Sequence, residues 1–348
     1  MVADLTELAA QEDAPRVVFF GMECSFSLSV LATLLGSGVE VCAIVMPAAK
    51  DLFMLGSSIS STNTAIFRLP ATHIPGGLLP MMQTGYTEER GSIVRLAQRE
   101  HIPVWCVRNL AAQETRETLA SYQPDLICVA CFSQVIPSVI LSLPRLGCVN
   151  VHPSLLPALR GPEPIFWAFH KGCMITGTTI HFMVPKLDSG AILAQETIAI
   201  PDGISATVLE EHCAHLGGKL LAQVVFALMH GHAHSYLQDE TQSSYQSYPQ
   251  AEDYMVTAQE WEARHLYNFI CGVADDTLPV ILRVHILDAD GAGVERYLSV
   301  SEALEYDNAA LLPLEGNDPA TMMPGEASGE WIVACRQGWV RVRESDSV

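Results

Sequence analysis

The sequence has few charged residues, and most of them are acidic. Charged residues make up 17% of its 348 residues and hydrophobic residues 49%, which excludes a disordered chain and fits a globular protein of two domains. The formal net charge is −20, and residues 249–348 hold 18 acids against 6 arginines, with no lysine after Lys219. Because an RNA-binding surface needs clustered basic side chains, this composition argues against a large nucleic-acid partner.

Several signatures are also missing. Residues 1–15 contain acids and no apolar core segment, so we expect no secretory signal. The turn after the predicted strand Arg16–Met22 has neither G-x-G-x-x-G nor a P-loop lysine, which excludes the common nucleotide sites. Ten cysteines without disulfide-like spacing predict a reducing, cytoplasmic setting. Cys128 and Cys131 form C-x-x-C but would face opposite sides of a strand, so we expect no redox or metal role.

Two further patterns have a plain interpretation. Leu126–Pro144 is uncharged, as a membrane span would be, but its serines, glutamine and proline fit a buried strand, a loop and a short helix better. We therefore predict no membrane span. Five histidines cluster late in the first domain without the spacing of a metal site, and we expect them to be solvated: His212, His215, His230, His232 and His234.

Apolar runs alternate with helical periodicity along the first two thirds of the chain. This alternation predicts an α/β fold with a doubly wound, mostly parallel sheet over residues 16–237. We expect residues 1–15 to form an N-terminal tail that precedes this domain. The predicted strands are Arg16–Met22, Val39–Met46, Pro103–Val107, Asp125–Cys131, Gly147–His152, Thr178–Val184 and Ala191–Ile200. The predicted helices are Ser25–Leu35, Gly91–Glu100, Gln113–Ser121, Glu163–His170 and Ser205–His230.

Two polar segments interrupt this pattern. The connection over residues 47–86 is unusually long, and loops of that kind are functional or disordered. Residues 238–255 are polar and predict a linker to a C-terminal domain at 256–348. There we expect a helix at Thr257–Gly272, strands at Pro279–Leu287 and Trp331–Val342, and an acidic insertion around Glu302–Asp318.

The stretch over residues 146–161, LGCVNVHPSLLPALRG, carries candidate chemistry. Asn150 and His152 interrupt a buried strand and, being two residues apart, point to the same face. An amide and an imidazole at the carboxyl end of a parallel strand can stabilise an oxyanion and move a proton. Asp188 follows in a Lys-Leu-Asp-Ser-Gly turn, where it either forms the turn or orients His152. Taken singly, each side chain also fits an ordinary strand end or turn.

These motifs together resemble the signature of enzymes that transfer formyl groups from 10-formyltetrahydrofolate. The resemblance rests on Asn-Val-His, Ser-Leu-Leu-Pro and Arg-Gly, followed by Leu-Asp-Ser-Gly. It implies a catalytic trio of Asn150, His152 and Asp188, a folate cosubstrate and no metal. The segment over residues 131–137 resembles the loop that holds the pterin ring. The implied folate-side residues are Phe132, Gln134, Val135, Ile136, Ser154, Leu155, Leu156 and Pro157, with Arg160 and Gly161 in the acceptor-side loop.

The resemblance also implies the formyltransferase fold and, from the C-terminal pattern, a small OB-like β-barrel as in methionyl-tRNA formyltransferases. In those enzymes an extended basic loop grips the tRNA, whereas residues 47–86 contain only Lys50, Asp51 and Arg68 as charged residues. We therefore expect a small amine acceptor, such as a nucleotide amino-sugar. The alternatives are methionyl-tRNA formyltransferase proper, a formyltetrahydrofolate hydrolase and a non-catalytic folate-binding protein. Against the hydrolase, the 15 residues before Arg16 are too few for the regulatory domain that usually precedes its catalytic domain.

Overall fold

The computed structural model describes most of the chain. The described residues are 15–48, 64–69, 92–275, 277–287, 293–310, 312, 314–315, 318–319 and 321–345. The predicted tail and most of the long connection at 47–86 lie outside them. The chain divides into two compact units: the first comprises residues 1–160, 177–197 and 211–243, and the second comprises residues 161–176, 198–210 and 244–348. The domain boundaries at 237 and 255 stay a prediction.

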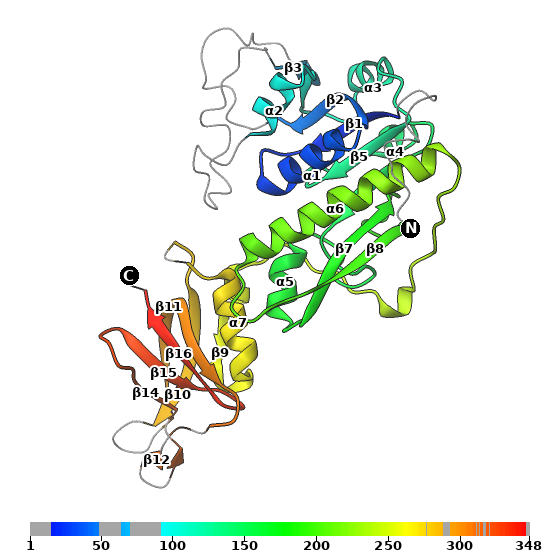
Figure 1. The fold of residues 1–348 in the computed structure, drawn as a ribbon. Helices are drawn as coiled ribbons and strands as arrows, with labels where there is room; N and C mark the ends of the chain where they lie inside the picture. The colour runs from blue at the N-terminus through cyan, green and yellow to red at the C-terminus, as the bar shows by residue number, and fades with distance from the viewer. Residues whose placement is uncertain are drawn as a thin grey trace, which may run out of the picture. The chain divides into compact units, whose positions relative to one another are not determined.

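The first unit is built on an eight-stranded sheet with the order β3-β4-β2-β1-β5-β6-β7-β8 (Figure 1). The strands are β1 (Arg16–Gly21), β2 (Glu40–Pro47), β3 (Ile66–Arg68), β4 (Val104–Val107), β5 (Leu126–Ala130), β6 (Cys148–His152), β7 (Ile175–Phe182) and β8 (Ile192–Ala199). The pairs β1–β2, β1–β5, β2–β4 and β5–β6 are parallel, whereas β3 and β7 pair antiparallel with β4 and β6. The predicted α/β sheet is confirmed, and β3 is an addition within the long connection.

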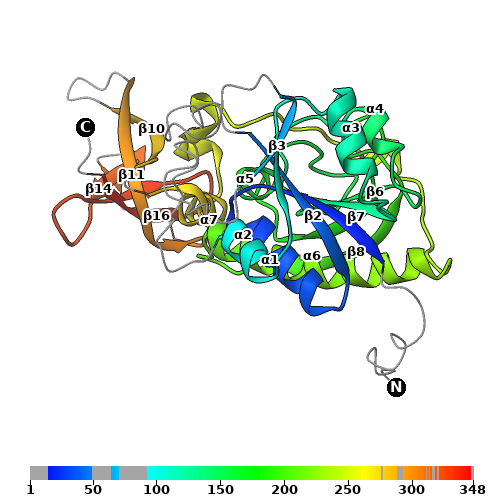
Figure 2. The ribbon, with the colours of Figure 1, turned by 90° about the horizontal axis from the view of Figure 1, so that it is seen from above.

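Helices cover both faces of this sheet (Figure 2). They are α1 (Ser25–Gly36), α2 (Ile93–Arg99), α3 (Gln113–Ala120), α4 (Ser138–Leu141) and α6 (Ala206–Met229). Leu119 of α3 and Ile140 of α4 join one buried core with Phe20, Val45 and Ile127 of the strands. The central strands β1 and β5 are buried on both faces, which explains why they are continuous apolar runs.

Helix α6 packs closely on the strand that carries Asn150 and His152. A Cβ on Gly217 would lie 2.5 Å from Cγ1 of Val151, and one on Gly218 would lie 2.6 Å from Cβ of Thr33 in α1. Among the described residues, α6 alone is long and apolar enough to cross a membrane, and half of its most apolar window is buried within the protein. These contacts are those of a helix in a protein core.

The second unit contains a six-stranded sheet with the order β14-β15-β16-β11-β10-β9. Its strands are β9 (Met255–Thr257), β10 (Val280–Leu287), β11 (Gly293–Asp307), β14 (Met322–Pro324), β15 (Glu330–Ala334) and β16 (Trp339–Glu344), while β12 (Leu314–Glu315) and β13 (Asp318–Pro319) form a separate hairpin. Helices α5 (Pro164–His170) and α7 (Ala263–Val273) complete the unit. Their aromatic side chains interlock, with the Phe166 and Phe269 ring centroids 5.8 Å apart.

Three predictions for this unit were wrong. The helix expected at Thr257–Gly272 begins at Ala263, because Met255–Thr257 pairs as a parallel edge strand with β10. The single strand expected at Trp331–Val342 is the hairpin β15–β16, turned at Gly338, whose φ is 78°. The acidic insertion expected from Glu302 begins inside β11, where Glu305 forms an ion pair of 2.8 Å with Arg341 of β16.

The contact of Gly217 with Val151 gives a stability prediction. We expect Gly217→Ala to lower the free energy of unfolding by about 1–3 kcal/mol, because the β-branched Val151 cannot rotate away from the added methyl group. Gly36→Ala is the matched control, since nothing lies within 4 Å of a Cβ at this helical position and the change should be neutral or stabilising. Urea unfolding of both variants measures the difference; equal stabilities would contradict the packing described.

Candidate active site

The pairing of β6 with β7 gathers four polar side chains on one face of the sheet. Asn150 lies opposite His181, and His152 lies opposite Thr179. Val151 points to the other face, toward α6, so the alternation of the strand separates the site from the core. His152 is 5% exposed and His181 is 1% exposed. The site therefore lies at the carboxyl end of β6, where α/β sheets commonly bind ligands.

The Asp188 carboxylate lies between the two imidazole rings. Its Oδ2 is 4.0 Å from Nδ1 of His152, and its Oδ1 is 3.7 Å from Nε2 of His181. Asp188 has a φ of 49°, a left-handed conformation that aspartate tolerates better than most residues. The side chain is 9% exposed. These distances exceed direct hydrogen bonds, as is common for catalytic groups without substrate. The structure thus brings the predicted trio to one place.

His181 was missed by the sequence analysis. Its Nδ1 lies 2.9 Å from the Phe182 carbonyl oxygen, which can only accept, so Nδ1 carries the proton. Nε2 then accepts from the Asn150 amide at 3.3 Å. Burial lowers the pKa of His181 to about 4, against the opposing effect of the Asp188 charge. A neutral His181 therefore fixes the orientation of the Asn150 amide. The signal was present as the alternation of Thr179 and His181 in a predicted strand.

The tautomer of His152 follows from a similar contact. Its Nε2 lies 2.9 Å from the Leu159 carbonyl oxygen and must donate to it. Nδ1 is therefore the ring atom that faces Asp188. Leu159 has a φ of 58°, so the loop after β6 turns its carbonyl toward the ring. A proton taken up at Nδ1 would lie beside a carboxylate.

Buried hydrogen bonds hold the loop over residues 154–157. The Thr179 hydroxyl donates to the Ser154 carbonyl at 2.6 Å and accepts from the Leu156 amide at 3.2 Å. The Gln195 amide donates to the Leu156 carbonyl at 2.9 Å. Ser154 and Leu156 are buried, whereas Leu155 and Pro157 are half-buried. The Leu155 side chain packs against Gly177. Ser154 and Leu156 are held by the buried hydrogen bonds of their backbone groups, so they fix the path of the loop.

The predicted pterin loop follows β5, the strand beside β6. Phe132 packs on Phe20 with ring centroids 5.1 Å apart, and Ile136 is buried in the core. The Gln134 side chain donates to the Val107 carbonyl at 3.1 Å, while Val135 is 85% exposed. Phe132 and Ile136 thus pack on or in the core, Gln134 is held by a hydrogen bond, and Val135 is exposed to solvent.

Arg160 is buried and belongs to a latch formed with Gln238, Glu240 and Lys186. Its guanidinium donates to Gln238 Oε1 at 2.7 Å and to Glu240 Oε1 at 2.9 Å. The Gln238 amide then donates to the carbonyl oxygens of Asp188 at 2.7 Å and Gly190 at 2.8 Å. Hydrogen bonds from Arg160 and Lys186 hold the Glu240 pKa well below its usual range.

The latch fixes the turn that carries Asp188. Gln238 uses both its oxygen and its nitrogen, so it joins the turn to Arg160 through one buried side chain. Gly161, the next residue, has a φ of 103°, and a Cβ there would lie 2.1 Å from the Gln246 carbonyl oxygen. Arg160 and Gly161 thus hold this loop in place, and their position in an acceptor-side loop stays a prediction.

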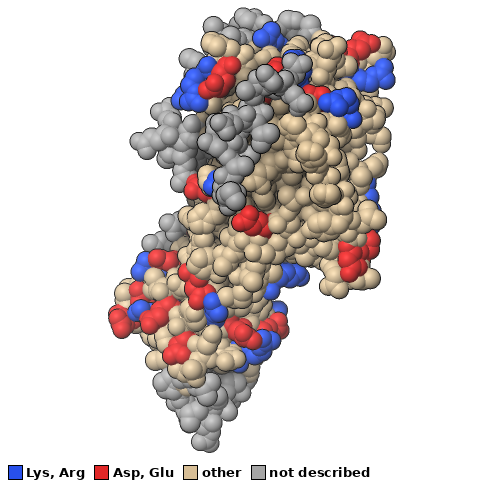
Figure 3. Space-filling model, turned by 45° about the vertical axis from the view of Figure 1, so that its right-hand side comes forward, with Lys and Arg blue, Asp and Glu red and all other residues tan. Residues whose placement is uncertain are grey.

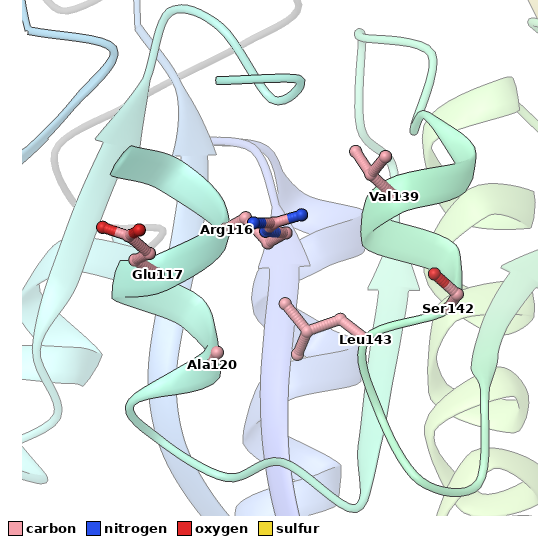
Figure 4. Close-up of a pocket in the computed structure, with 6 residues that line it drawn as sticks. All are labelled: Arg116, Glu117, Ala120, Val139, Ser142 and Leu143. Atoms are coloured by element: carbon pink, nitrogen blue, oxygen red, sulfur yellow. The ribbon is translucent and has the colours of Figure 1, made fainter. Parts of the chain in front are cut away.

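Other candidate groups lie apart from the trio. A hollow of about 440 Å³ between α3 and α4 is lined by Arg116, Glu117, Ala120, Val139, Ser142 and Leu143 (Figure 4). None of these residues belongs to the candidate site. The five clustered histidines are all exposed, as expected. Within the described part of the chain, no group of three or more His, Cys, Asp or Glu side chains is placed to hold a metal ion.

Comparison with known proteins gives a family match over part of the chain. Residues 81–225 match the family model described as formyl transferase. Methionyl-tRNA formyltransferase of Staphylococcus aureus strain JH1 is 35% identical over 182 residues, which cover 52% of this chain and 58% of that protein. The chain thus spans less than two thirds of the length of the curated relatives it matches. The same values hold for the protein of strain N315.

Solved structures show the same fold. The N-formyltransferase from Helicobacter canadensis, solved with folinic acid and dTDP-3-aminofucose, has a TM-score of 0.61 at 13% identity and covers 94% of this chain and 98% of its own. HypX from Aquifex aeolicus with tetrahydrofolic acid has a TM-score of 0.54 at 15% identity and covers 94% of this chain and 43% of its own. At these identities the likeness is one of fold. Residues 81–225 thus resemble a formyl transferase domain, and the curated relatives that the chain matches are methionyl-tRNA formyltransferases.

Proposed function

We propose that this protein transfers a formyl group from 10-formyltetrahydrofolate to an amine, with Asn150, His152 and Asp188 as the catalytic residues. The observation that carries the proposal is the Asp188 carboxylate between the His152 and His181 rings, beside the Asn150 amide. Relatives with this fold act on formyl groups, and solved neighbours were obtained with folates. The combination of an amide donor, an imidazole and a carboxylate fits acyl transfer.

The residues of the candidate folate loop fit such a cosubstrate. Val135 is exposed and Phe132 is half-buried in the segment that follows β5, so both can offer apolar surface to a flat ring. Among the described residues, the backbone amides of Gln134 and Val135 donate to no other backbone group. They suit the polar edge of a pterin. Bound there, 10-formyltetrahydrofolate would supply a formyl group whose oxygen gains negative charge when an amine adds.

Asn150 and His152 would stabilise that charge. The Asn150 amide has two hydrogens, and neutral His181 accepts one, which leaves the second to donate to the formyl oxygen. Asp188 would hold His152 and assist the passage of the proton from the amine to the departing folate nitrogen. Arg160 and Gln238 would act indirectly by holding the Asp188 turn.

The acceptor we propose is a small amine such as a nucleotide amino-sugar. Of the six arginines after residue 248, four form ion pairs within the second unit: Arg264, Arg336, Arg341 and Arg343. Arg296 lies over the Trp331 ring at 4.2 Å. On the face shown in Figure 3, basic side chains over the six-stranded sheet lie among acidic ones. Such paired charges offer little to a phosphate backbone.

Methionyl-tRNA is the second candidate acceptor, because the S. aureus relatives are named methionyl-tRNA formyltransferases.

We also propose that the second unit is an OB-like β-barrel. Its support is the 15-residue strand β11, whose register against β16 shifts twice. Bulges of this kind bend a strand enough to close a sheet.

The trio is tested by Asp188→Asn and His152→Ala. We expect each variant to fold and to lose about 10²- to 10³-fold in turnover, since each loses a group that acts on developing charge or on the proton. Folate release from 10-formyltetrahydrofolate in the presence of the amine measures the rate. His215→Ala, an exposed histidine on α6, is the matched control. Full activity in either site variant would overturn the assignment.

The acceptor is tested with a panel of nucleotide amino-sugars against charged initiator tRNA. We expect turnover with a small amine and little dependence on salt. A tRNA-dependent rate that falls steeply between 50 and 200 mM salt would instead indicate about six or more phosphate contacts. Folate release without any acceptor would identify the hydrolase alternative.

The latch is tested by Gln238→Leu, with the exposed Gln242→Leu as control. The variant leaves buried carbonyl and guanidinium groups without their partner, so we expect a loss of about 1–3 kcal/mol in the free energy of unfolding. We also expect kcat to fall about 10- to 100-fold at an unchanged KM for the folate, since a displaced Asp188 affects the reaction more than binding. A parallel loss in Gln242→Leu would contradict a specific role for Gln238.

A further inference from the structure

Two cysteines lie at the carboxyl ends of neighbouring strands, outside the trio. Strands β1 and β5 are parallel and in register, with Gly21 opposite Ala130. Cys131 follows Ala130 directly and has a left-handed φ of 58°. Cys24 lies just beyond β1 as the N-cap of α1, where its sulfur accepts from the Ser27 amide. The two strand ends therefore bring these residues to the same edge of the sheet.

Ser27 joins the two corners. Its hydroxyl donates to the Ala130 carbonyl at 2.6 Å and accepts from the Met22 amide at 3.0 Å. The Cys24 sulfur lies 3.4 Å from the same hydroxyl oxygen. Cys24 also has a side-chain hydrogen bond with Cys131. Neither cysteine forms a disulfide and both are partly exposed, so a small oxidant can reach this corner of the sheet.

Cys24 differs chemically from the other cysteines. The hydrogen bond with Cys131 lowers the pKa of Cys24 to about 7, and bonds from Ser27 act in the same direction. Burial instead raises the pKa of Cys42 to about 11 and that of Cys106, Cys148 and Cys335 to about 12. Because the thiolate is the reactive form, Cys24 should react with an electrophile at neutral pH faster than these four thiols.

We propose that Cys24 and Cys131 form a disulfide in response to peroxides. The Cys24 thiolate attacks hydrogen peroxide, breaking the O–O bond and giving a sulfenic acid and hydroxide. The Cys131 thiol then displaces the sulfenic oxygen as water, which takes up the thiol proton, and the proton that Cys24 released on forming its thiolate neutralises the hydroxide. In sum, two thiols and one peroxide give one disulfide and two waters, so that two sulfurs are oxidised and two oxygens reduced.

The partner is Cys24 and not Cys128, the other member of the C-x-x-C sequence. Cys128 is fully buried within β5, and burial raises the pKa of its thiol. A Cys24–Cys131 bond would join the start of α1 to the residue that precedes the Phe132–Ile136 loop. The disulfide is independent of the proposed enzyme activity, since it requires only the two thiols and the oxidant.

The experiment treats the full-length protein with hydrogen peroxide and measures intact mass, followed by peptide mapping without reduction. We expect a loss of two hydrogen atoms, one linked peptide pair containing Cys24 and Cys131, and reversal by dithiothreitol. Before oxidation, iodoacetamide should label Cys24 about tenfold faster at pH 7 than an ordinary thiol, because the thiolate fraction is larger by that factor.

Cys24→Ser and Cys131→Ser should each abolish the linked peptide pair, whereas Cys42→Ser, a partly exposed cysteine of high pKa, should retain it. The wild-type peptide map decides the outcome even if a variant fails to fold. Oxidation of the wild type to sulfinic or sulfonic acid at Cys24, or a disulfide that joins other cysteines, would overturn the proposal.

Discussion

The register between β6 and β7 is the constraint on which the candidate site depends. Because Asn150 pairs with His181, the amide and the imidazole that orients it come from two antiparallel strands held by backbone hydrogen bonds. A shift by one residue would place Val151 in the site and Asn150 against α6. Close packing of Gly217 on Val151 opposes that shift. The pairing of β6 with β7 thus places the polar site on one face of the sheet and the apolar contact with α6 on the other.

Charge at the site is balanced by its surroundings. Asp188 brings the negative charge to the two imidazoles, and the low pKa of His181 leaves that ring neutral near pH 7. The nearby guanidinium of Arg160 is neutralised by Glu240, which also pairs with Lys186 at 2.8 Å. The neutral His181 ring thus orients the Asn150 amide, whereas His152 presents its Nδ1 to the Asp188 carboxylate.

The sequence predicted the first unit well because its strands are long apolar runs separated by amphipathic helices. It predicted less of the second unit. Short strands such as β9 show no clear alternation of apolar and polar residues, and the hairpin at Gly338 depends on a close approach to the Asp307 carbonyl, which is distant in sequence. At the site, Asn150, His152 and Asp188 were read from a motif, and their roles stay a prediction. His181 and Gln238 were missed because pairing register and a buried latch are properties of the fold.

The division into units bears on how this architecture could have arisen. The chain leaves the first unit after Arg160, returns at Gly177, leaves again at Ile198, returns at Glu211 and leaves finally at Ser244. Helix α5 thus belongs to the second unit, where Phe166 packs against Phe269 of α7. A gene that acquired the second unit by simple fusion at one boundary would have lacked the aromatic partner of α7. The second unit is therefore discontinuous in the sequence, because two of its three segments lie between stretches of the first unit.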